Sequence, residues 1–147
     1  MLLDDEYFMQ QAYIQAQKAY DNDEVPIGAV IVLENKIIAK GYNQVERLHD
    51  PTAHAEIIAI TTACNYLGAK YLPEAKLFVT IEPCLMCAGA IYWSKMKEVI
   101  FGAADIKNGY HKYTNNTSPF HPKTIIKKGL MEDACMGLMQ QFFRSKR

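Results

Sequence analysis

Apolar side chains near the N-terminus recur at the spacing of a helix. Phe8, Ala12, Ala16 and Ala19 are three or four positions apart, so they share one helical face. The pattern predicts a helix over about residues 5–22, capped by an aspartate at its start, with its apolar face against a sheet.

The pattern then changes to that of β-strands. Residues 27–33 are a continuous apolar run of strand length, and residues 37–41 are a second run after a polar turn at 34–36. Two strands joined by so short a turn predict a hairpin. Residues 43–51 carry mixed charge and are predicted to be a loop.

The rest of the chain alternates helical and strand patterns. In order, it predicts a helix over about 53–67, a strand over 77–81, a helix over 84–95, a strand over 99–102, a strand over 123–127 and a helix over 131–143. Strands separated by helices favour an α/β fold, a five-stranded mixed sheet covered on both faces in three layers, α/β/α. We expect residues 1–147 to form a single domain, with a long polar loop over 103–120.

Charge and composition narrow the range of partners. Sixteen basic residues balance sixteen acidic ones, so the chain as a whole has no net attraction to nucleic acid, and any RNA contact must be local. The N-terminal residues are acidic and lack the basic start and apolar core of a secretory signal. No apolar run is long enough to cross a bilayer, so we expect a cytoplasmic protein without a membrane partner.

Three residues suggest a metal site. His54, Cys84 and Cys87 offer one imidazole and two thiolates, which are good ligands for zinc. A structural zinc takes four protein ligands, whereas a catalytic zinc keeps one position open for water. With three evident ligands, we expect one catalytic Zn²⁺ per chain. Glu56 is two residues from His54 and is the candidate catalytic acid and base.

The predicted helix starts strengthen this interpretation. His54 falls in the first turn of one helix, and Cys84 and Cys87 fall on one face of the first turn of another, with Pro83 expected at the first helical position. The positive end of a helix favours the thiolate form that binds metal. Three alternatives remain: a redox C-x-x-C motif, a structural zinc with a distant fourth ligand, and a non-catalytic zinc module that binds RNA or a partner.

The two motifs H-x-E and P-C-x-x-C together resemble those of the zinc-dependent nucleobase deaminases. Within that superfamily the chain looks most like the bacterial tRNA-specific adenosine deaminases, through the runs at residues 24–30, 49–57, 77–84 and 101–103. The resemblance implies a cytidine-deaminase-like fold. It also implies hydrolytic deamination of adenosine to inosine at the wobble position of a tRNA anticodon loop.

The resemblance also implies substrate contacts. Asn43 matches an asparagine that contacts the target base, although by itself it would be read as a turn residue. The remaining matches are Val25 and the backbone of Ala55 in the base pocket, Glu82 and Pro83 in the wall beside it, and Asp105 at the nucleotide backbone. Phe143 is available for stacking on a base, near basic residues of the last third that could hold phosphates.

Some features depart from the adenosine branch. Where that branch has small residues, this chain has the bulky run Tyr110-His111-Lys112-Tyr113, and residues 90–93 are similar to guanine deaminases. Both departures fall on an expected substrate wall. The alternative substrate is therefore a free base or nucleoside, guanine or cytosine/cytidine. The family is typically dimeric, so we expect a homodimer.

Overall fold

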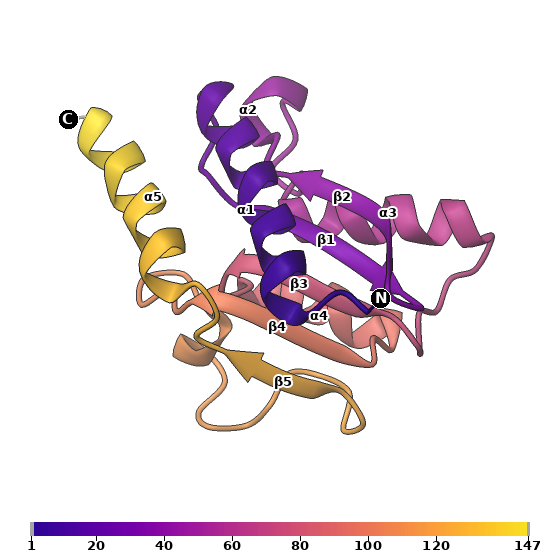
Figure 1. The fold of residues 1–147 in the computed structure, drawn as a ribbon. Coiled ribbons are helices and arrows are strands. Elements are labelled where there is room, and N and C mark those ends of the chain that lie inside the picture. Colours follow the sequence, from indigo (N-terminus) through magenta and orange to yellow (C-terminus); the bar gives the residue numbers. More distant parts are fainter. Residues whose placement is uncertain (1, 147) are drawn as a thin grey trace.

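A mixed sheet of five strands forms the middle layer of the computed structural model, which describes residues 2–146 (Figure 1). The strands are β1 (Gly28–Leu33), β2 (Lys36–Tyr42), β3 (Lys76–Ile81), β4 (Glu98–Ala103) and β5 (Ile125–Lys128). Their order is β2-β1-β3-β4-β5. The pairs β1–β2 and β1–β3 are antiparallel, and β3–β4 and β4–β5 are parallel, which confirms the predicted five-stranded mixed sheet.

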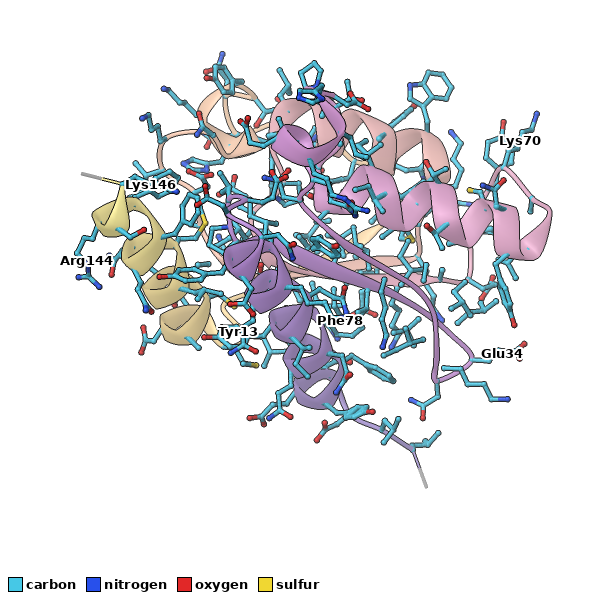
Figure 2. The ribbon with its side chains drawn as sticks, turned by 90° about the horizontal axis from the view of Figure 1, so that it is seen from above. Tyr13, Glu34, Lys70, Phe78, Arg144 and Lys146 are labelled. Atoms are coloured by element: carbon cyan, nitrogen blue, oxygen red, sulfur yellow. The ribbon has the colours of Figure 1, made fainter. Side chains whose placement is uncertain are left out.

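Helices cover both faces of this sheet, because its strands are apolar on both sides. The helices α1 (Asp5–Asp21) and α5 (Glu132–Ser145) lie on one face, and α3 (Ala55–Leu67) and α4 (Leu85–Ser94) lie on the other (Figure 1). Alternate residues of β3 point opposite ways: Phe78 packs beneath α1, whereas Leu77 and Val79 belong to the core beneath α3 and α4. Figure 2 shows Tyr13 of α1 between α1 and α5.

Two glycines allow helices to approach the sheet closely. A Cβ built on Gly28 of β1 would lie 2.2 Å from the carbonyl oxygen of Ala12 in α1. A Cβ on Gly41 of β2 would lie 2.4 Å from the carbonyl oxygen of Ala55 at the start of α3. These two contacts fix α1 against one face and the first turn of α3 against the other.

The structure corrects several predicted boundaries. The short helix α2 (Val45–Leu48) interrupts the predicted loop over 43–51. The carboxylate of Glu24 stabilises its start by accepting hydrogen bonds from the backbone N–H of Glu46 at 3.0 Å and of Arg47 at 2.8 Å. The polar segment over 103–120 contains one 3₁₀ turn, η1 (Tyr110–Lys112). None of the helices formed by residues 2–146 combines the length and apolarity needed to cross a membrane.

A substitution at Gly28 tests the packing of α1 on the sheet. We expect Gly28→Ala to lower the free energy of unfolding by about 1–3 kcal/mol, because the new methyl group would overlap the backbone of α1. The matched control is Gly137→Ala in α5, where a Cβ meets no atom within 4 Å. We expect this control to be neutral or stabilising by about 0.5–1 kcal/mol. Urea denaturation of both variants measures the difference, and equal midpoints would contradict the close approach.

Candidate active site

The starts of α3 and α4 converge at one point. His54 is the N-cap residue of α3, and Cys84 is the N-cap residue of α4. Both helices therefore direct their unpaired backbone N–H groups and positive dipole ends toward the same place. Pro83 was expected at the first helical position, but α4 begins at Leu85, so Pro83 lies before the cap. The reason is that Cys84 keeps an extended backbone, with φ −72° and ψ 172°.

His54, Cys84 and Cys87 form a compact donor group. The Nδ1 atom of His54 lies 3.5 Å from the sulfur of Cys84 and 3.5 Å from the sulfur of Cys87. All three donor atoms lie within 4.8 Å of one another. Zinc bonds of about 2.3 Å to sulfur and about 2.0 Å to nitrogen place neighbouring tetrahedral ligands about 3.5 Å apart. The donors therefore fit one tetrahedral zinc ion with three protein ligands.

The pKa values of the two thiols are shifted in opposite directions. Hydrogen bonding from Cys87, and then from His54, lowers the pKa of Cys84 to about 4. The same pairing with Cys84, together with burial, raises the pKa of Cys87. Hydrogen bonding to Cys84 raises the pKa of His54 as well. A divalent cation at this point would stabilise both thiolates, as a zinc site requires.

Glu56 lies on the first turn of α3 and is 3% exposed. Burial is the main reason that the pKa of its carboxyl is raised to about 7, and the negative charge of Cys84 adds to the effect. A group with a pKa near neutrality can both accept and release a proton at physiological pH. A cation between the three donors would lower this pKa. Glu56 is therefore suited to move protons beside the donor group.

A large cavity opens over these residues. Its volume is about 1920 Å³, and its wall contains His54, Glu56 and Cys84 together with segments far apart in sequence. The predicted substrate contacts Val25, Asn43, Ala55, Glu82, Asp105 and Phe143 all line it. Pro83 is buried and is not among the lining residues.

Asn43 is a buried polar residue in the wall of the cavity. Asn43 is 7% exposed, and its side-chain oxygen Oδ1 is buried without a hydrogen-bond partner in the described part of the chain. An unpaired buried acceptor is costly, so such an atom normally finds a donor. Asn43 also lines the cavity, where a ligand can supply that donor.

Asp105 and Glu82 hold the loop that follows β4. The Oδ1 atom of Asp105 accepts hydrogen bonds from the backbone N–H of Lys107 at 3.2 Å and of Asn108 at 3.0 Å, which is the geometry of a turn residue. The buried carboxylate of Glu82 accepts from the backbone N–H of Asp105 at 3.1 Å and of His111 at 3.0 Å. Their positions in the wall are thus fixed by the loop itself.

The bulky run after this loop does not fill the cavity. Tyr110 packs edge-to-face against Phe101 and Phe120, with ring centroids 6.3 and 5.0 Å away. His111 pairs with Glu82, so it is more than the loop histidine expected from the sequence. Of the four bulky residues, only Tyr113 lines the cavity. Most of this bulky run therefore lies outside the cavity lining.

Several cavity residues were not predicted from the sequence. Glu24 is 2% exposed and holds α2, which places Arg47 in the wall. Ile106 and Met86 line the mouth, although both are exposed apolar residues. No local pattern marks these positions, because the wall is assembled from segments far apart in sequence. Only Glu24 could have been picked out from the sequence, since a carboxylate next to an apolar strand needs hydrogen-bond partners when it is buried.

Comparisons with known proteins agree with this geometry. Residues 3–103 match the family model of the cytidine and deoxycytidylate deaminase zinc-binding region. The chain is 41% identical to the tRNA-specific adenosine deaminase of Agrobacterium fabrum, covering 96% of this chain and 95% of that protein. It is 42% identical to the chloroplastic tRNA(adenine(34)) deaminase of Arabidopsis thaliana, but spans only 12% of that much longer protein.

Solved structures give the same result. A structure from studies of A-to-I editing by tRNA:A34 deaminases has a TM-score of 0.83 at 40% identity, over 90% of this chain and 98% of that one. A guanine deaminase from Bacillus subtilis has a TM-score of 0.67 at 43% identity, over 69% of this chain and 66% of that one. The chain therefore belongs to the cytidine and deoxycytidylate deaminase zinc-binding family, in the branch of the tRNA-specific adenosine deaminases.

Proposed function

We propose that this protein hydrolyses adenosine to inosine at the wobble position of a tRNA anticodon loop. The observation that carries the proposal is the buried carboxylate of Glu56 beside the His54, Cys84 and Cys87 donors, at the inner wall of a wide cavity. The near end-to-end similarity to tRNA-specific adenosine deaminases supports the choice of substrate. The proposal places the chain in the cytoplasm with its tRNA.

One zinc ion per chain is part of the proposal. His54, Cys84 and Cys87 would hold it, and no fourth donor joins this group among residues 2–146, which leaves a position for water. When bound, zinc supplies Lewis acidity that lowers the pKa of water from about 15.7 toward 7, so that a nucleophile is available at neutral pH.

Glu56 carries out the proton transfers. Water adds to C6 of the adenine ring, and Glu56 takes the proton that this water releases. The carboxyl delivers this proton to a ring nitrogen, then takes the remaining proton of the new C6 hydroxyl and delivers it to the departing amine. The C6–N bond breaks, ammonia leaves and the oxygen of water remains on C6 as the carbonyl of inosine. One buried carboxyl beside the donor group can perform each of these transfers in turn.

The inner wall of the cavity orients the base. The unpaired Oδ1 of Asn43 would accept a hydrogen bond from the bound nucleoside, and the amide nitrogen could donate one. Val25 offers an apolar contact, and Ala55 offers its backbone at the start of α3. These three residues surround the position that the reacting base must reach.

The mouth of the cavity suits a polymer. The cavity has a volume of about 1920 Å³, which exceeds the roughly 300–1,000 Å³ of an ordinary small-molecule pocket. Its lining includes five exposed apolar or aromatic residues on which splayed bases could stack: Leu85, Met86, Ile106, Tyr113 and Phe143. Arg47, Lys107 and Arg144 also line it, and none of them has an ion-pair partner within 4.0 Å among residues 2–146. Figure 2 shows Arg144 at the end of α5.

A free base is the second candidate substrate. The 43% identity with a guanine deaminase over two thirds of the chain favours it, as does the formal net charge of zero. Acidic residues such as Asp23 and Glu46 also line the cavity and reduce its attraction for phosphate. Because the chemistry at Glu56 would be the same, only substrate turnover distinguishes the two candidates.

We also propose that the protein is a homodimer. Helix α4 is apolar on all sides, and such a helix is normally buried all round. One of its faces packs on the sheet, but the opposite face leaves Trp93 67% exposed in line with Leu85 and Gly89. A second copy of the chain would cover this face, in keeping with the dimers typical of the family that the sequence resembles.

The choice of substrate is tested by ammonia release. We expect turnover with transcribed tRNA or its anticodon stem-loop, and at least 100-fold lower turnover with free adenosine, guanine and cytosine, since only RNA can use the mouth of the cavity. Enzymatic ammonia detection and inosine analysis of the digested RNA are the measurements. Rapid turnover of guanine that tRNA does not inhibit would overturn the proposal in favour of the second candidate.

The division of roles between ligands and Glu56 is tested by two variants. We expect Glu56→Gln to retain about one zinc per chain but lose about 10²-fold or more in deamination, because the amide cannot shuttle protons. We expect Cys87→Ser to lose both the metal and the activity. Elemental analysis and ammonia release measure the two properties. The assigned roles are wrong if Glu56→Gln remains fully active.

The dimer is tested at the exposed face of α4. We expect Trp93→Glu to produce a monomer, because a charge in an apolar interface is costly to desolvate. Ile14→Glu on α1 is the matched control, since Ile14 is also apolar and exposed but lies on another helix. Sedimentation velocity reports the mass of each variant. A wild-type protein that sediments as a monomer refutes this part of the proposal.

A further inference from the structure

We propose that His111 and Glu82 form a positioning pair that fixes the 104–113 segment as a wall of the substrate cavity and thereby sets the affinity for substrate. The inference rests on the proposed function. It begins from a buried carboxylate that takes no part in the proton transfers at Glu56. Glu82 is 4% exposed, follows β3 directly and lies two residues before Cys84.

The carboxylate of Glu82 is occupied by the 104–113 segment. Its Oε1 accepts the backbone N–H of Asp105, and its Oε2 accepts that of His111. Gly109 lies so close that a Cβ there would be 2.4 Å from the carboxyl carbon. Glu82 thus accepts hydrogen bonds from both ends of the segment and lies in close contact with its middle.

His111 completes the pair. Its Nδ1 lies 2.8 Å from Oε1 and 2.7 Å from Oε2 of Glu82. A carboxylate only accepts, so Nδ1 carries the proton and donates it. About half of the imidazole is exposed, whereas the side chain of Glu82 is 2% exposed. The imidazole therefore shields the carboxylate from water. A charge-assisted hydrogen bond is strongest in such a water-poor environment.

The same segment is also hydrogen-bonded to the residues between β3 and α4. The backbone N–H of Tyr110 donates to the carbonyl of Pro83 at 2.9 Å, and Gly109 forms a β-bridge with Cys84. The ring of Tyr110 is fixed between Phe101 and Phe120. These contacts do not use the side chain of His111, so the middle of the segment stays attached to the start of α4 when the imidazole is removed.

The residues that this pair holds are the ones that face substrate. Asp105, Ile106, Lys107 and Tyr113 line the cavity, whereas His111 does not. Without the imidazole, Glu82 would keep only backbone donors and gain access to water. The wall would then be held less firmly, and binding substrate would require it to be ordered first, which weakens affinity but leaves Glu56 in place.

Steady-state kinetics with the anticodon stem-loop tests this inference. We expect His111→Ala to raise KM about three- to tenfold with kcat within about twofold of wild type. His111→Asn can still donate from its amide at a similar distance, so we expect it to recover most of the lost affinity. The control is His121→Ala, which removes an imidazole outside the cavity lining and should change neither constant.

Amide hydrogen exchange tests the pair without relying on activity. In His111→Ala, we expect faster exchange at the N–H groups of Asp105 and His111 itself, which donate to Glu82, and unchanged exchange in β1 and β3. Unchanged exchange together with an unchanged KM would overturn the inference, as would a loss confined to kcat. If no RNA is deaminated even by the wild type, the proposed function fails, while the exchange measurement still decides whether the pair holds the wall.

Discussion

The chemistry of this protein depends on two helices that start at the same point. The N-cap residues of α3 and α4 are themselves candidate metal donors, so the backbone dipoles that favour a thiolate point at the atoms that need it. The parallel pairing of β3 and β4, and the close contact of Gly41 with the start of α3, hold both helix starts at one end of the sheet.

Two buried carboxylates organise the walls around this point in the same way. Glu24 accepts two backbone N–H groups from the start of α2, and Glu82 accepts two from the segment after β4. Each carboxylate is almost fully buried, so losing these partners would leave a costly unpaired charge. Charge-assisted hydrogen bonds therefore fix these loops in addition to the apolar packing of Tyr110.

Much of the fold followed from local patterns. The five strands, and the helices at both ends of the chain, appear near their predicted positions because their apolar periods do not depend on distant residues. The candidate metal donors were also evident, since imidazole and two thiolates at this spacing are typical of a zinc site. In contrast, α2 was missed because the group that stabilises its start, Glu24, lies more than twenty residues away in sequence.

The sequence by itself determined the donor group, the neighbouring carboxylate Glu56 and the layered α/β architecture, because residue type and short spacing are enough to specify them. Only the tertiary structure decided which side chains face the substrate. Tyr110, His111 and Tyr113 are close neighbours in the chain, but the first enters the core, the second binds Glu82 and the third faces the cavity. That division depends on contacts with β4 and with the end of β3, whose positions no local pattern encodes.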